Sequence, residues 1–154
     1  MKDCILVLDN LRSVENTGSI FRTAEGLGVK RIVLVGTTPA PTDRFGRRRK
    51  DFAKVALGAE ELISWEVCKS ISPKLKELRK AGYKIAVLEQ HPKAKELMKL
   101  KASKLALVVG NEVEGVSRAA LRSADFILEI PMRGKKESLN VSVAAGIALF
   151  ELLK

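Results

Sequence analysis

The sequence predicts an α/β domain in which helices cover both faces of a mostly parallel, six-stranded sheet. Short apolar runs rich in branched residues recur without polar alternation, which is typical of strands buried on both faces. Segments with helical spacing of apolar residues lie between these runs, and such alternation favours parallel pairing. The chain has 154 residues and no linker, repeat or low-complexity tract, so one domain spanning 1–154 is expected.

Five apolar runs and one weaker candidate account for the predicted strands. Each run is short and bounded by polar residues or glycine, as buried strands are. The strands are expected at 5–8, 32–35, 85–88, 105–109 and 126–130, with 62–65 as the weaker sixth.

Helices are expected at 18–27, 73–80, 93–100, 117–122 and 140–153. The second has the clearest boundaries, with Ser72 as N-cap, Pro73 at the first helical position and Gly82 beyond the end. The segment 36–50 carries two prolines and two glycines and is expected to be a long irregular loop. Such a loop in a compact domain is usually functional or disordered.

The charge of the chain predicts an anionic partner. The formal net charge is +10, and no basic amphipathic helix or lipidation signal points to a membrane, so nucleic acid is favoured. The alternative is a basic surface that is only solvated. The densest cations, Arg44, Arg47, Arg48, Arg49, Lys50 and Lys54, fall in and beside the irregular loop. Phe45 and Phe52 lie among them and could stack on unpaired bases or belong to the core.

No pattern predicts a metal site or covalent catalysis. Cys4 and Cys68 have neither metal-type spacing nor a disulfide framework, so they are expected to be buried thiols in a reducing compartment. The apolar run near the N-terminus is too short for a signal peptide or a membrane span. A cytoplasmic protein is therefore expected, and a diffusible cofactor must bring the reactive group.

Two glycine-bearing loops follow strands at the edge where parallel sheets bind ligands. In the first, 16–24, Asn16 either caps the next helix or contacts a ligand, whereas Arg22 opposes the helix dipole and is expected to meet an anion. In the second, 110–115, Glu112 and Glu114 would repel phosphate and favour an uncharged or cationic ligand. The alternative for this second loop is a simple turn.

The third segment, 130–145, joins a buried strand to the last helix through a basic loop. Ser138 and Asn140 are both good N-cap residues. The helix needs one cap, so at least one of these polar side chains is free for other work. A binding role is predicted for this segment.

Together these segments resemble the SpoU/TrmH family of SPOUT RNA methyltransferases. The motifs are Asn16-x-Gly18-x-x-x-Arg22, then Gly110-x-Glu112-x-x-Gly115, then Ile130-Pro-Met-x-Gly with Ser138-Leu-Asn-Val-Ser-Val-Ala. The resemblance spans nearly the whole chain in the family's order, and 54–60 is similar to the family's segment after its variable basic loop.

The resemblance implies a deep C-terminal trefoil knot, a rare exception to unknotted topology. It also implies a homodimer in which the first motif of one subunit completes the other's site. S-adenosylmethionine would be the cofactor. It would be bound by Leu88, Gly110, Ile130, Ser138 and Leu139.

The implied reaction is methyl transfer to a ribose 2′-hydroxyl of tRNA or rRNA. Arg22 would bind phosphate and stabilise the developing alkoxide, or act as the base, and Asn16, Glu112, Ser138 and Asn140 would orient the groups. No added RNA-binding domain is expected, so the core would hold the RNA. The residues expected to bind it are Arg12, Arg44, Arg47, Arg48, Arg49 and Lys54. The alternatives are a non-catalytic RNA-binding module on the same fold, and a nucleotide-dependent oxidoreductase, which lacks its G-x-G-x-x-G fingerprint.

Overall fold

Seven parallel strands form the single sheet of the computed structural model, which describes residues 1–154. The strands are β1 (Asp3–Asp9), β2 (Arg31–Val35), β3 (Ser64–Cys68), β4 (Lys84–Leu88), β5 (Lys95–Glu96), β6 (Lys104–Gly110) and β7 (Phe126–Glu129). Their order is β3-β2-β1-β6-β4-β7-β5, and every pairing is parallel. The predicted parallel α/β sheet is confirmed, whereas the predicted count of six strands is wrong.

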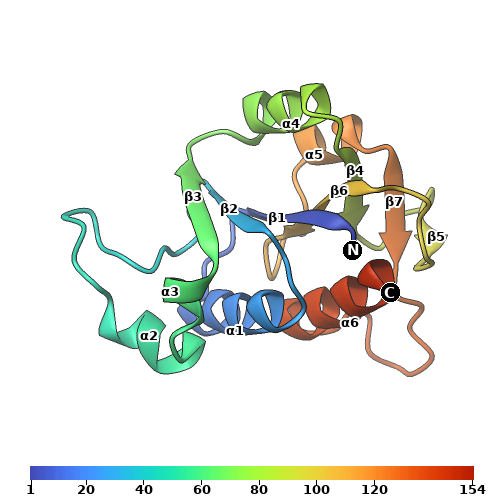
Figure 1. Ribbon diagram of the computed structural model, residues 1–154. Helices are drawn as coiled ribbons and strands as arrows, with labels where there is room; N and C mark the ends of the chain where they lie inside the picture. Colours follow the sequence, from blue (N-terminus) through green and yellow to red (C-terminus); the bar gives the residue numbers. More distant parts are fainter.

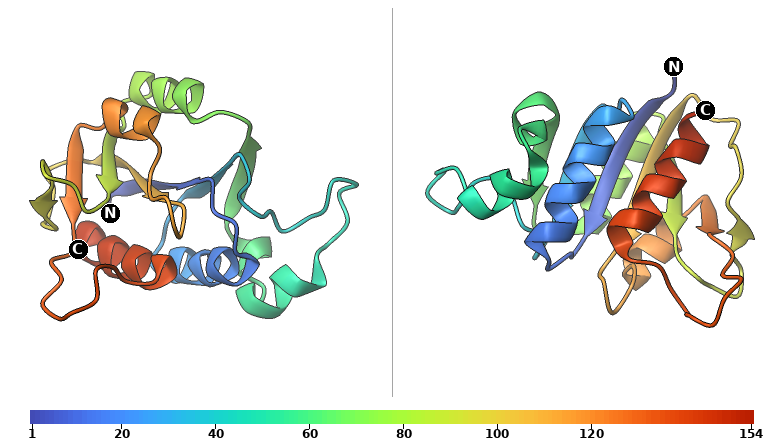
Figure 2. Two further views of the ribbon diagram at one scale, coloured as in Figure 1. Left: turned by 180° about the vertical axis from the view of Figure 1, so that it is seen from behind. Right: turned by 90° about the horizontal axis from the view of Figure 1, so that it is seen from below.

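Helices cover both faces of this sheet, as the sequence predicts (Figure 1). They are α1 (Val14–Gly26), α2 (Lys50–Ala56), α3 (Ala59–Leu62), α4 (Ile71–Lys80), α5 (Arg118–Ser123) and α6 (Val141–Leu153). One face carries α1, α2, α3 and α6, with α1 and α6 side by side, and the other carries α4 and α5 (Figure 2). No helix is long and apolar enough to cross a membrane.

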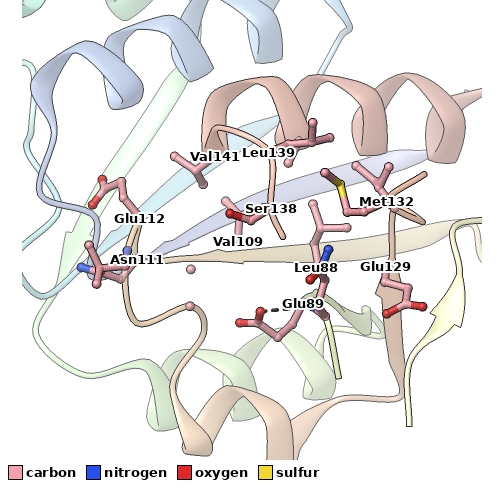
Figure 3. A pocket seen from close by; sticks show the side chains of 16 residues that line it. Leu88, Glu89, Val109, Asn111, Glu112, Glu129, Met132, Ser138, Leu139 and Val141 are labelled. Carbon is pink, nitrogen blue, oxygen red and sulfur yellow. Dashed lines mark hydrogen bonds between the residues drawn. The ribbon is translucent and has the colours of Figure 1, made fainter. Parts of the chain in front are cut away.

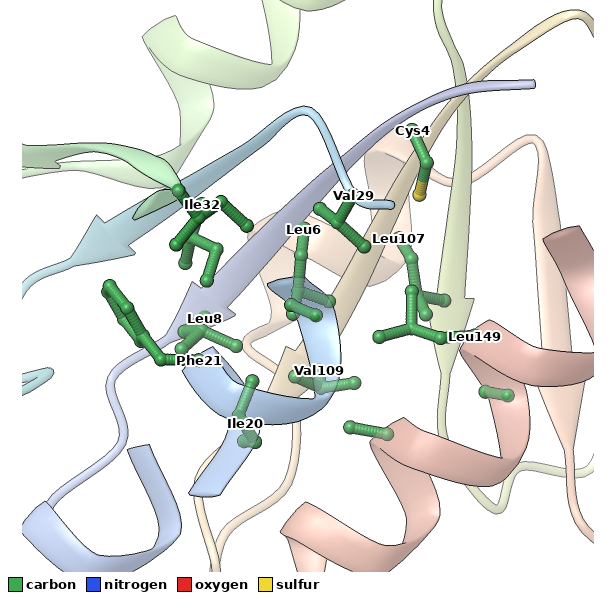
Figure 4. Packing of buried hydrophobic residues seen from close by; sticks show 14 of the residues in the cluster. Cys4, Leu6, Leu8, Ile20, Phe21, Val29, Ile32, Leu107, Val109 and Leu149 are labelled. Carbon is green, nitrogen blue, oxygen red and sulfur yellow. The ribbon is translucent and has the colours of Figure 1, made fainter. Parts of the chain in front are cut away.

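The alternation of side chains along β1 shows why both faces are covered. Leu6 and Leu8 belong to the core beneath α1 and α6, whereas Ile5 and Val7 belong to the core beneath α4. All four are at most 1% exposed. Figure 4 shows the larger core, where residues of β1 and β6 meet Ile20 and Phe21 of α1.

The predicted helix at 93–100 is wrong, because this segment pairs with the sheet edge instead. Its residues 95–96 form β5, and the N–H of Leu97 donates to the carbonyl of Glu129 at 2.8 Å. The apolar residue Leu100 is buried against the larger core. Backbone hydrogen bonds with β7 thus replace those of a helix. A short helix is stable mainly when one of its faces packs against the core, and this segment has no such buried face.

Other element boundaries also differ from the sequence prediction. α1 begins four residues early because Ser13 caps it, accepting a hydrogen bond from the N–H of Asn16 at 3.1 Å. α4 has Ser70 rather than Ser72 at its N-cap position, and its added first turn buries Ile71. The weak strand at 62–65 shifts to β3. The helices α2 and α3 were not predicted.

Phe52 packs α2 against α1, so its removal should lower the stability of the fold. Its ring meets Phe21 edge-on with centroids 5.1 Å apart, and both side chains are fully buried. We expect Phe52→Ala to lower the free energy of unfolding by about 3–5 kcal/mol, measured by urea denaturation. The matched control is Phe45→Ala, which removes a ring that is 67% exposed and should change stability by less than about 0.5 kcal/mol. Equal effects of the two substitutions would contradict this packing.

Candidate functional site

A pocket opens at the carboxyl ends of β4, β6 and β7, beside the start of α6 (Figure 3). Three segments far apart in the sequence line it, from residues 88–90, 109–115 and 129–144. The five residues expected to bind the cofactor all lie in this lining: Leu88, Gly110, Ile130, Ser138 and Leu139. Met132, Val141 and Ala144 add apolar surface; they stand in the third motif but were not predicted to bind the cofactor.

The charge of the pocket is opposite to that of the chain. Glu89, Glu112 and Glu129 belong to the lining, which contains no lysine, arginine or histidine. The chain as a whole carries +10. Because like charges repel at short range, the pocket disfavours phosphate and suits a ligand with a cationic group.

Close packing between two glycines shapes the pocket wall. A Cβ on Gly110 would lie 2.2 Å from the carbonyl carbon of Gly115, closer than atoms can approach. Gly115 itself has a φ of +73°, and a Cβ there would lie 2.1 Å from Glu89 Oε2. Both positions therefore require glycine.

Glu89 holds this loop in place, a role that sequence reasoning missed. Its Oε2 accepts a hydrogen bond from the N–H of Val116 at 2.8 Å. Within the loop, the Oδ1 of Asn111 accepts from the N–H groups of Val113 and Glu114. The position of Glu89 directly after a predicted strand was the available signal, but no local pattern reveals a contact 27 residues away.

Glu112 joins the second loop to the first. Its Oε1 accepts hydrogen bonds from the N–H groups of Arg12 at 3.0 Å and Ser13 at 3.1 Å, just before α1. Burial raises the pKa of the Glu112 carboxyl, but these N–H groups outweigh burial, and the pKa lies below its ordinary value of 4.5. The side chain of Asn16 contributes in the same direction. An ionised carboxylate is thus fixed at the pocket rim.

The third segment meets the first through two asparagines. Asn140 caps α6, accepting from the N–H of Ser142 at 2.9 Å, and its Nδ2 donates to Asn16 Oδ1 at 3.1 Å. Ser138 is exposed in the pocket lining and makes no hydrogen bond. Ser138 is therefore the free polar side chain that the sequence predicted, and Asn16 is a partner of Asn140 rather than a helix cap.

Arg22 stands apart from these residues. It lies on α1, is exposed, and makes no hydrogen bond or ion pair. It is not part of the pocket lining. Of the predicted catalytic residues, the single chain gathers Asn16, Glu112, Ser138 and Asn140, but not Arg22.

The predicted RNA-binding residues divide into two groups. Arg12, Arg44 and Lys54 form no ion pair with a carboxylate. The other three are paired: Arg47 with Asp43 at 2.9 Å, Arg49 with Asp51 at 2.8 Å, and Arg48 with Glu60 and Glu61 at 3.7 and 4.0 Å. Much of the positive charge of this segment is therefore compensated within the chain.

The ion pair between Arg48 and Glu60 stabilises a buried carboxylate. The side chain of Glu60 is 4% exposed, and neither of its carboxylate oxygens has a hydrogen-bond partner. A buried carboxylate without a cation is strongly unfavourable. Arg48 is the cation nearest to it, so this arginine helps to anchor the basic segment on α3.

Comparison with known proteins shows which family the chain resembles. A model of the SpoU rRNA methylase family matches residues 3–150. The 23S rRNA (guanosine-2'-O-)-methyltransferase RlmB of Ralstonia nicotianae is 34% identical over 152 residues, covering 97% of this chain and 58% of that protein. The chain thus spans little more than half the length of this relative.

Two solved structures share the fold. The AdoMet-bound rRNA methyltransferase from Sinorhizobium meliloti superimposes with a TM-score of 0.85 at 28% identity, covering 97% of this chain and 55% of that one. The TrmH/SpoU tRNA modifying enzyme of A. aeolicus gives a TM-score of 0.83 at 30% identity, covering 99% of this chain and 75% of that one.

The ionised state of Glu112 makes a prediction about stability. A carboxyl with a lowered folded-state pKa stabilises the protein fully above its unfolded pKa, 4.5, and this stabilisation is lost as the pH falls through the folded-state pKa. We expect Glu112→Gln to be less stable than the wild type near neutral pH, with a difference that shrinks below about pH 4.5.

Urea denaturation across this pH range measures the difference. The matched control is Glu114→Gln, because Glu114 lies in the same loop and its carboxylate accepts no hydrogen bond. A Glu112→Gln difference that did not change with pH would contradict the proposed hydrogen bonds to an ionised carboxylate.

Proposed function

The chain belongs to the SpoU rRNA methylase family, and on that basis we propose that it is an S-adenosylmethionine-dependent RNA methyltransferase. The substrate we propose is a ribose 2′-hydroxyl of tRNA or rRNA. The observation that carries the proposal is the acidic pocket without a cation in a chain of charge +10. S-adenosylmethionine has a sulfonium and an ammonium group, so its charge matches this pocket.

The apolar part of the pocket lining suits the cofactor as well as its acidic part does. Leu88, Ile130 and Leu139 would supply apolar contacts for an adenine ring, and the close packing of Gly110 against Gly115 fixes the wall beside them. Glu89 and Glu112 place negative charge near the rim. When bound, the cofactor supplies the electrophilic methyl group.

The protein's own residues would hold the ribose, and its hydroxyl proton would pass to solvent as the oxygen takes the methyl group. The free hydroxyl of Ser138 lines the pocket, and the Asn16–Asn140 pair lies where the first and third segments meet. A guanidinium group offers only hydrogen-bond donors, so the proposed role of Arg22 is to bind the neighbouring phosphate and stabilise the developing alkoxide.

A homodimer would bring Arg22 to a pocket. A stripe of exposed apolar residues, Val143, Ile147 and Phe150, runs along α6 with exposures of 50%, 41% and 58%. Thr23, next to Arg22, lies against α6, because a Cβ on Gly146 would be 3.4 Å from its Cγ2. A second copy covering this stripe would therefore receive Arg22 close to its own surface, and we propose such a composite site.

The trefoil knot and the cytoplasmic location belong to the same proposal. The knot would be formed by threading the segment around 130–140 past the loop that follows β6. The contact of both with one pocket supports this arrangement. A cytoplasmic location is the expected one for a protein acting on tRNA or rRNA.

Arg22→Ala tests the catalytic role. We expect the variant to fold, to bind S-adenosylmethionine as the wild type does, and to lose methyl transfer by about 10²–10³-fold, because a charge-stabilising donor is removed. Calorimetric titration measures binding, and transfer of a labelled methyl group to total RNA lacking this modification measures activity. Full activity of the variant would exclude the role of Arg22, and a wild type that binds no cofactor would favour a non-catalytic RNA-binding module.

A mixing experiment tests the composite site. Gly115→Ala should strain the pocket loop at its positive φ, displace Glu89 from it and be inactive alone. In a mixture of Arg22→Ala and Gly115→Ala subunits that exchange freely, half of the dimers are mixed and each has one intact site. We therefore expect roughly a quarter of the wild-type activity to return. No recovery despite demonstrated subunit exchange would contradict the composite site.

The paired and unpaired cations should affect RNA binding differently. Lys54 has no carboxylate partner, so we expect Lys54→Gln to reduce the slope of log affinity against log salt by about 0.7–0.9, without loss of stability. Arg48→Gln leaves Glu60 buried without its cation and should instead destabilise the fold by about 1–3 kcal/mol, with a smaller change in slope. Filter binding at several salt concentrations and urea denaturation measure the two effects. Identical slopes for both variants would contradict this division.

A further inference from the structure

The tip of the basic segment is an ordered hairpin. Thr42 and Arg48 form an antiparallel bridge, and the N–H of Asp43 donates to the carbonyl of Arg47 at 2.8 Å. Gly46 permits the turn with a φ of +76°. The irregular segment predicted at 36–50 therefore contains a defined structure, although it has no helix or strand before residue 50.

Asp43 fixes the conformation of this tip from inside. Its Oδ1 accepts hydrogen bonds from the N–H groups of Phe45 and Arg47, at 2.9 and 3.0 Å, and its Oδ2 accepts from Arg47 Nε at 2.9 Å. The N–H groups of Arg47 and Phe45 hold the pKa of Asp43 below its ordinary value. The hairpin is thus arranged before any ligand arrives.

Phe45 projects from this tip, and its ring has cation–π contacts with two guanidinium groups. The ring is 67% exposed, whereas Phe52 and Phe21 are fully buried. The Cζ of Arg44 lies 4.8 Å from the ring centroid and that of Arg47 lies 5.0 Å from it. An aromatic ring beside two cations on a rigid turn is the chemistry that binds an unpaired base and its phosphates.

We propose that Phe45 is a stacking platform for an unpaired base of the RNA, with Arg44 and Arg47 contacting the adjacent phosphates. This inference rests on the proposed RNA methyltransferase function and narrows its substrate to RNA with an exposed single-stranded nucleotide. Bases inside a duplex have both faces covered by their neighbours and cannot stack on the ring.

The hairpin lies away from the pocket of its own chain. The hairpin follows β2 at the β3 side of the sheet, whereas the pocket opens at β4, β6 and β7 (Figure 1). The base on Phe45 is therefore a different nucleotide from the one whose ribose enters the pocket of the same chain.

Affinities for two RNAs test the platform. Wild type, Phe45→Ala, Phe45→Leu and Phe45→Trp are compared on a single-stranded oligonucleotide and on a duplex of equal length at one salt concentration. We expect Phe45→Ala to weaken single-strand binding by about 5- to 100-fold and duplex binding by less than about 2-fold. Phe45→Trp should retain affinity and Phe45→Leu should not. Equal losses on both RNAs, or full affinity of Phe45→Leu, would overturn the proposal.

Fluorescence gives a direct readout of stacking. Trp65 is the only tryptophan of the chain, so the wild type measures its contribution and Phe45→Trp adds a reporter at the tip. We expect the single strand to quench the added emission, and a lack of quenching in a bound complex would overturn the proposal.

Titration with S-adenosylmethionine separates a failure of the stacking platform from a failure of the proposed methyltransferase function. If the wild type binds cofactor and RNA but Phe45→Ala is unaffected, only the platform fails. If the wild type binds neither, the proposed function fails with it.

Discussion

The register between β1 and β6 is the constraint on which the site depends. These central strands pair along their full length, from Asp3 opposite Lys104 to Asp9 opposite Gly110, so both end at the same level of the sheet. The chain leaving β1 and the chain leaving β6 therefore emerge side by side. This proximity lets the Glu112 carboxylate reach the N–H groups before α1. A shift of one residue would turn the buried side chains of β1 to the opposite face.

Opposite charges are segregated within a small molecule. Negative side chains lie in the pocket, which has room for a small ligand. The concave surface of the pocket concentrates their electrostatic field. Positive side chains lie on the outer segment around 44–54, where a long polyanion can reach them. The two surfaces can therefore attract ligands of opposite charge without competing for them.

The sequence predicted those features that depend on local pattern. The buried strands are recognisable because branched apolar runs persist for their whole length, and the pocket residues follow strand ends directly. The helix predicted at 93–100 failed because pairing with β7, a non-local interaction, outweighs a weak helical pattern. The contact of Glu89 with Val116 and the burial of Glu60 beside Arg48 were also unpredictable, since each joins segments whose proximity only the fold creates. Phe45 and Phe52 illustrate the same limit: two similar rings seven positions apart have opposite environments.

The carboxylates that pair with Arg47, Arg48 and Arg49 would affect how the proposed RNA-binding surface searches among nucleic acids. A polyanion that approaches this segment must compete with Asp43, Asp51 and Glu60 for the guanidinium groups, so charge alone yields less adhesion than six neighbouring cations would suggest. Weak general adhesion shortens each unproductive encounter. If RNA is the partner, a molecule with this arrangement would sample many RNA chains quickly and dwell only where a second, non-electrostatic contact is made.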